Sequence, residues 1–179
     1  LIEALGAHPS HEGTNLLLEL AADPLLTKAV TAALSTSADA SAIDYLIERL
    51  VIRKERTLAQ FGLVHVGPPA QAAIESRLES VGEDRRVLLH LPLTLAKFEN
   101  QSAIDVLLRV LRSDHHSGFI RYKALRGLEQ IALHTKLGID PAPILAEIAR
   151  NALEYLRLLG MALPLRGEPA TRERTSLSL

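Results

Sequence analysis

Residues 101–134 read QSAIDVLLRVLRSDHHSGFIRYKALRGLEQIALH, and this stretch decides the fold. Its apolar residues recur every three or four positions on both sides of a polar turn at 114–118, which predicts amphipathic helices over 101–112 and 119–134. Ala and Leu, both strong helix formers, dominate the two segments. No part of the chain shows the alternation bounded by hairpin turns that predicts strands. The stretch therefore predicts a helical hairpin in an all-α chain.

A second hairpin, with helices expected over about 69–81 and 84–98, precedes the first. Ala70 corresponds to Ala103 and Val87 to Ile120, an offset of 33 residues in both cases. The matched apolar positions are Ala70, Ala73, Ile74, Leu78, Val87, Leu91, Leu95 and Phe98, with Ala103, Val106, Leu107, Leu111, Ile120, Ala124, Leu128 and Ile131 as their counterparts. A fixed period of this length in a helical chain predicts a repeat array, in which hairpins bury their apolar faces by stacking.

Breaker residues divide the rest of the chain into further helices. We expect a first helix that ends at Asp23, a second over 25–34, one long helix over about 40–61 and a last helix over about 142–160. Residues 63–66 are expected to form a linker, and 161–179 a frayed tail. The sequence thus predicts a single domain over 1–160 with about eight helices, most regular over 68–134.

Composition narrows the classes of function. The chain has 20 basic and 21 acidic residues and a net charge of -1, so its overall charge favours neither nucleic acid nor anionic lipid. It has no Cys, which excludes disulfides and thiolate chemistry. No apolar run is long enough to span a membrane. The chain opens on Leu, and we expect it to be a segment of a longer cytoplasmic protein, which could be tethered to a membrane elsewhere.

Seven histidines are the main candidates for chemistry. His8 and His11, and His115 and His116, lie at predicted turns, without an HExxH motif or a third convergent ligand. A GxSxG elbow and a Gly-rich phosphate loop are also missing from the sequence. We therefore expect no metal, no cofactor and no enzymatic activity.

Residues 102–131 resemble HEAT repeats, above all in the run Arg121-Tyr122-Lys123-Ala124-Leu125-Arg126-Gly127-Leu128. Asp114 in the turn, followed by Arg121, Ala124 and Leu128 at helical spacing, fits the pattern of such repeats, and HEAT helices tolerate a bending proline such as Pro92. The resemblance covers about 68–134, and the segment 40–61 departs from it. It implies a right-handed α-solenoid of stacked antiparallel helix pairs, an armadillo-type superhelix whose second helices line the concave face.

Four polar side chains fall within an arc of about 80° on the predicted helix over 84–98, because a helix turns about 100° per residue. They are Arg86, His90, Thr94 and Lys97. The offset carries this stripe to Lys123 and Gln130, with Arg126 beside them. By the resemblance, a basic strip lies on the concave face and consists of Arg86, His90, Lys97, Lys123, Arg126 and Gln130. We hypothesise that it binds an acidic peptide or protein segment; the alternative is a solvated face without a function.

The sequence leaves three functions open. The first is a protein-interaction scaffold that binds its partner on the concave face. The second is a regulatory cytoplasmic domain of a larger, transporter-like bacterial membrane protein. The third is a HEAT-like nucleic-acid-binding protein or DNA glycosylase, against which the aromatic content of 3% argues.

Overall fold

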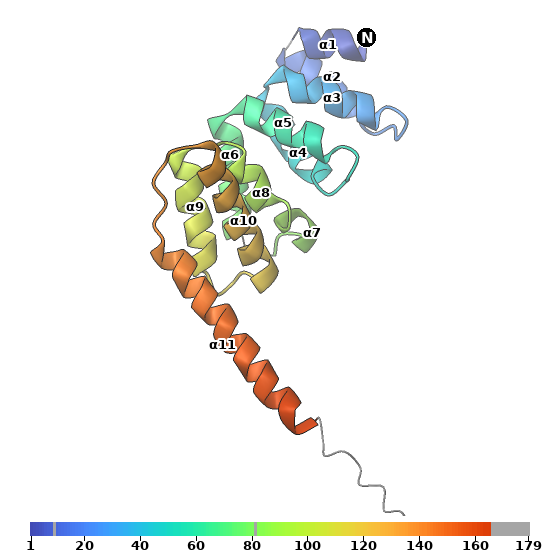
Figure 1. Ribbon diagram of the computed structural model, residues 1–179. Coiled ribbons are helices and arrows are strands. Elements are labelled where there is room, and N and C mark those ends of the chain that lie inside the picture. The colour runs from blue at the N-terminus through green and yellow to red at the C-terminus, as the bar shows by residue number, and fades with distance from the viewer. Residues whose placement is uncertain (9, 81, 166–179) are drawn as a thin grey trace, which may run out of the picture. The chain divides into compact units, whose positions relative to one another are not determined.

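The computed structural model describes residues 1–8, 10–80 and 82–165, and in these residues it contains helices, turns and loops but no strand (Figure 1). The prediction of an all-α chain is confirmed. The described part holds eleven α-helices and one 3-10 helix, more than the eight or so expected. The helices are α1 (Ile2–Ala7), α2 (His11–Leu20), α3 (Thr27–Ser37), η1 (Ala40–Ala42), α4 (Ile43–Arg49), α5 (Arg56–Val66), α6 (Pro68–Glu79), α7 (Arg85–Leu88), α8 (Leu91–Ala96), α9 (Gln101–Arg112), α10 (Gly118–His134) and α11 (Ala142–Leu165).

Contacts divide the chain into two units, Leu1–Asp140 and Pro141–Leu179. The first unit contains α1 to α10, and the described part of the second contains α11. The division falls inside the single domain expected over 1–160, which stays a prediction. α11 extends to Leu165 instead of ending near 160, and the rest of the expected tail, 166–179, lies outside the described residues.

Polar side chains cap the starts of α2, η1, α7, α9 and α10 in the first unit. The Ser10 hydroxyl accepts a hydrogen bond from the Gly13 amide at the start of α2 (3.0 Å). The Asn100 side chain accepts from the Ala103 amide at the start of α9 (2.8 Å), and Ser117 caps α10 in the same way. Such caps satisfy amides that have no partner within the helix, so the local sequence specifies where these helices begin.

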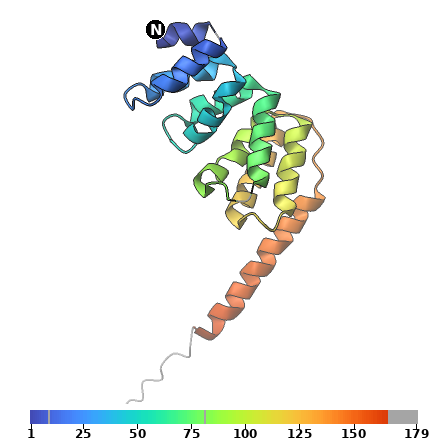
Figure 2. The ribbon, with the colours of Figure 1, turned by 180° about the vertical axis from the view of Figure 1, so that it is seen from behind.

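Of the two hairpins that were predicted to match, only the first helices agree fully in the structure. α6 and α9 have 12 residues each, begin 33 positions apart and lie side by side (Figure 2). The second helices begin with the same offset, but α10 is continuous whereas its counterpart is split into α7 and α8. The continuous helix predicted over 84–98 is therefore wrong. Pro92 explains the break, because its ring has no N–H to donate and clashes with the carbonyl group four residues earlier.

The long helix predicted over 40–61 is also wrong, because α4 ends at Arg49 and α5 begins at Arg56. The Arg56 side chain folds back over this turn and donates hydrogen bonds to the carbonyl oxygens of Leu50 (2.6 Å) and Val51 (3.2 Å). Glu55 is buried in the turn and accepts a hydrogen bond from the Thr31 hydroxyl of α3 (3.1 Å). Side-chain hydrogen bonds thus stop a helix that apolar spacing alone would continue.

Close packing explains why the predicted linker over 63–66 is helical instead. α3 packs between α1 and α5, and α5 crosses it at Gly62 (Figure 1). A Cβ atom on Gly62 would lie 2.7 Å from the Ser35 Cα atom, so only glycine allows this crossing. Gly62 is consequently a contact residue in the middle of α5 and does not end a helix.

In the part of the chain that the structure describes, no helix combines the length and the apolar character needed to cross a membrane.

Candidate partner-binding groove

Four of the six residues of the predicted strip line two surface hollows of the first unit. Lys97 follows α8, and Lys123, Arg126 and Gln130 lie on α10. One surface hollow, between α8 and α10, is lined by Leu93, Tyr122, Lys123, Arg126, Glu129, Gln130 and Leu133. A second, between α5, α8 and α10, is lined by Thr57, Gln60, Phe61, Val64, Lys97, Glu99, Gln130 and His134. Gln130 lines both hollows, so they adjoin, and together they are called the α10 groove below.

The charges in the α10 groove are only partly balanced. Arg126 forms an ion pair with Glu129 on the same helix, and His134 Nδ1 lies 2.8 Å from a carboxylate oxygen of Glu99. Lys97 and Lys123 have no ion pair within the described residues. The Lys123 ammonium instead lies 5.2 Å from the centre of the Phe119 ring. The groove therefore offers two cationic side chains to an acidic partner.

His90 does not contribute an exposed cation to the groove. It is half-buried at the start of α8, and this burial, together with the positive charges of Arg56 and Lys123, lowers the pKa of its imidazole. The neutral ring is therefore favoured at neutral pH.

Thr94 is fully buried, and its expected place in the polar stripe is wrong. Its hydroxyl donates to the His90 carbonyl oxygen (2.8 Å) and accepts from Gln60 Nε2 of α5 (3.2 Å). The break before α8 changes the direction of the helix, so an arc calculated for one straight helix does not hold across Pro92. Thr94 therefore joins α8 to α5 instead of facing a partner.

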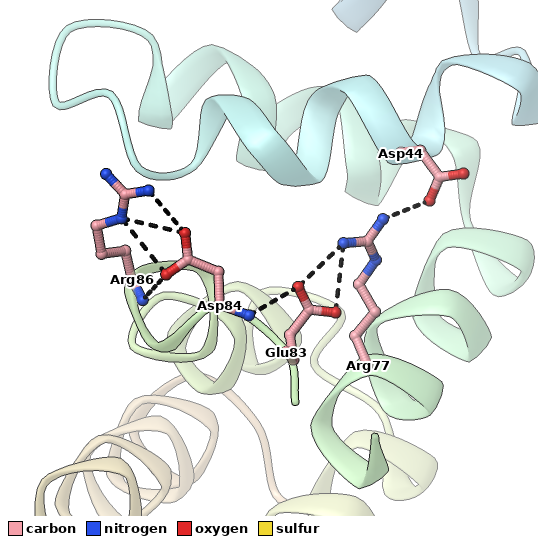
Figure 3. A network of polar contacts seen from close by, with 5 residues as sticks. All are labelled: Asp44, Arg77, Glu83, Asp84 and Arg86. Carbon is pink, nitrogen blue, oxygen red and sulfur yellow. Dashed lines mark hydrogen bonds and ion pairs between the residues drawn. The ribbon is translucent and has the colours of Figure 1, made fainter. Parts of the chain in front are cut away.

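Arg86 lies on α7 and lines neither hollow of the groove. Its guanidinium pairs with Asp84, with Nη2 and Oδ2 2.8 Å apart (Figure 3). The neighbouring Arg77 of α6 donates to Asp44 of α4 (2.8 Å) and Glu83 (3.3 Å), and these bonds raise the pKa of Arg77. This cluster ties α4 and α6 to the 83–84 segment. Arg86 thus belongs with a surface ion-pair network outside the groove.

The apolar side chains of the groove do not follow from the sequence patterns. Phe61, Tyr122 and Leu133 are 58%, 50% and 77% exposed. Phe61 would end the predicted helix over 40–61, whereas α5 in its true register turns Ala59, Gly62 and Leu63 inward and Phe61 outward. Tyr122 of α10 also points outward and is half-exposed. For Tyr122 and Leu133 the detectable signal was their position, since both fall outside the apolar stripe of α10.

A third hollow lies on the other side of the Phe61–His65 ring pair, whose centroids are 5.9 Å apart. It lies over α1 and α3 and is lined by Glu3, Gly6, Ala7, Ala29, Ala32, Ala33, Thr36, Ser37, Ala38 and His65. Small side chains leave the helix backbones accessible, so another polypeptide can approach closely here. Since His65 borders this hollow and Phe61 borders the α10 groove, α5 carries one aromatic ring at each.

Comparisons with known proteins identify no family for this chain. The chain matches no protein-family model, no curated protein and no solved structure. The residues of the groove are therefore the basis on which a function is inferred.

Proposed function

We propose that this chain is a non-enzymatic protein-interaction module that binds a partner segment in the α10 groove. The observation that carries the proposal is the combination of Lys97 and Lys123 with exposed apolar side chains along one set of helices. Groups of this kind are what protein interfaces use: aromatic and aliphatic anchors give affinity, and charges at the rim give orientation and rate.

The architecture we propose is a HEAT-like α-solenoid. Its support is that α6 and α9 agree in length and offset, and that each helix of the first unit packs chiefly against helices close to it in sequence. In such an array α3, α5, α8 and α10 are the second helices of successive pairs. The α10 groove and the hollow over α1 and α3 would then lie on the same, concave face.

The partner segment we propose has acidic residues beside a large apolar residue. The acidic residues meet Lys97 and Lys123, and the apolar side chain packs against Phe61 or between Tyr122 and Leu133. Glu129 forms an ion pair with Arg126, so it repels an acidic segment less than a free carboxylate would.

Selection from a displayed library of random peptides tests this proposal, because such a library contains acidic, basic and apolar segments alike. Peptides selected on the wild-type chain are expected to be rich in Asp and Glu and to share a large apolar residue. The double variant Lys97→Glu/Lys123→Glu should weaken their binding by more than roughly tenfold, because two attractions become repulsions.

The matched control is Lys28→Glu/Lys54→Glu, which makes the same change of net charge at exposed positions that line neither hollow of the groove. Its binding should stay within about twofold of the wild type, because distant surface charges are screened. Peptides without acidic residues, or equal losses in both double variants, would contradict the proposal.

The alternatives from the sequence gain less support. Nucleic acid is disfavoured because the chain has a net charge of -1 and the two lysines of the groove are few for a phosphate backbone. A gel-shift experiment with a short duplex at low salt tests that alternative directly. A regulatory cytoplasmic domain of a larger membrane protein remains compatible with the proposal, since the groove would then bind a segment of the same protein.

A further inference from the structure

The second unit carries an amphipathic helix whose apolar face is exposed. On α11, five apolar residues lie within an arc of about 80°, since each residue turns the helix by about 100°. They are Leu145, Ile148, Ala152, Leu156 and Leu159, and are called the α11 seam. The four large side chains are 41–62% exposed, and Ala152 is exposed as well. A helix face of this kind is the type of surface that another helix covers.

The charged side chains of α11 lie on the opposite side. Glu147, Arg150, Glu154 and Arg157 occupy their own arc of about 80°, diametrically across from the seam. Arg150 and Glu147 form an ion pair of 3.5 Å on this side. The residues that flank the seam, including Ile144, Ala149 and Tyr155, carry no charge. The seam therefore offers nothing that would recognise a charged partner helix.

The spacing and the size of the seam residues are symmetric about Ala152. Leu145 and Leu159 lie seven residues on either side of it, and Ile148 and Leu156 lie four residues on either side. The charged line is reversed in sign by the same operation, because Glu147 exchanges with Arg157 and Arg150 with Glu154. A two-fold axis at Ala152 thus matches large residues with large residues and small with small.

We propose that α11 pairs antiparallel with α11 of a second copy of this chain, through the α11 seam and about a two-fold axis at Ala152. Leu145 then lies against Leu159 of the second copy, Ile148 against Leu156 of the second copy, and the two Ala152 residues meet where the helices come closest. A contact of this type is self-complementary and closes at the dimer.

Cysteine cross-linking of the full chain tests both the pairing and its direction, because the native chain has no Cys. Ala152→Cys should give a disulfide-linked dimer on mild oxidation, since the two-fold axis brings this position next to itself. Leu145→Cys and Leu159→Cys should each stay monomeric alone and cross-link when mixed. Glu154→Cys, on the charged side, is the control and should stay monomeric.

Sedimentation equilibrium gives an independent measurement. Leu156→Ser should weaken dimerisation at least roughly tenfold, because each substitution removes two buried side chains from a symmetric dimer. The neighbouring Arg157→Ser should leave the dimerisation constant within about twofold, since exposed charges contribute little. Circular dichroism of both variants checks that the helices are retained.

Three results would overturn the proposal. They are a chain that stays monomeric at the highest concentration measured, an Ala152→Cys chain that does not cross-link, and co-sedimentation of the monomer with phosphatidylcholine–phosphatidylglycerol vesicles in place of dimerisation. The proposed binding in the α10 groove uses none of the seam residues, so either proposal can fail without the other.

Discussion

The hairpin of α6 with α7 and α8, and the hairpin of α9 with α10, begin with the same 33-residue offset and differ in their second helices. α10 runs through 17 residues without a break, and its side chains Lys123, Arg126 and Glu129 all line the groove. In the other hairpin Pro92 stops the helix, which leaves His90 half-buried and Thr94 inside. Apolar spacing therefore determines that a helix packs in the core, whereas Pro92 determines which polar side chains of the second helix remain exposed to solvent.

The largest loss of stability is expected from substitutions in the core, and it should be equal in the two hairpins. Leu95 of α8 and Leu128 of α10 hold matching positions and are 0% and 1% exposed. Leu95→Ala and Leu128→Ala should each lower the free energy of unfolding by about 2–5 kcal/mol, because each leaves a cavity. Urea unfolding of both variants measures this. A loss at Leu95 far smaller than at Leu128 would mean that the broken helix is not part of the common core.

The contact between α8 and α10 should tolerate little additional side-chain volume. A Cβ atom on Gly127 of α10 would lie 3.1 Å from the Pro92 carbonyl oxygen and 3.2 Å from the Ala96 Cβ atom. Gly127→Ala should therefore cost about 1–3 kcal/mol of stability despite the better helix propensity of Ala. Gly138→Ala, where a Cβ atom meets nothing within 4 Å, is the control. Equal thermal stability of Gly127→Ala and the wild type would contradict this packing.

The difference between the hairpins can be removed at Pro92. Pro92→Ala should join α7 and α8, because the new amide can donate to the Leu88 carbonyl oxygen. Helicity measured by circular dichroism should rise, and the new amide should be protected from hydrogen exchange. Stability should change by less than about 1 kcal/mol, since the added hydrogen bond is offset by a more flexible unfolded chain. An unchanged break would show that tertiary packing, and not the proline, bends this segment.

The smallest effect is expected from the pH dependence at His90. Its pKa in the folded chain lies below the ordinary value of about 6.5, so the unfolded chain binds the proton more readily. Stability should therefore fall as the pH drops below neutral through 6.5 or so, until the folded-state pKa is passed. His90→Gln should lose less stability than the wild type over this window in thermal unfolding. Lys123→Met should reduce the difference, because it removes one of the charges that lower the pKa.

Local sequence predicted the regular hairpin well because its signals are local. The polar caps at Asn100 and Ser117, and the apolar spacing between them, specify α9 and α10 without reference to the rest of the chain. The same signals predicted the start and length of α6. Half of the candidate site followed from them too, since Lys123, Arg126 and Gln130 lie on a continuous helix.

By itself, the sequence determined that this chain is helical, where its regular helices begin and which residues form the core, because these depend on periodicity and caps within a few residues. Tertiary structure alone decided the turn held by Arg56, the crossing at Gly62 and the exposure of Phe61. The crossing joins α5 to α3, and the turn depends on bonds from Arg56 to the Leu50 and Val51 carbonyl oxygens and from Thr31 of α3 to Glu55. Contacts of this kind leave no local periodicity in the sequence.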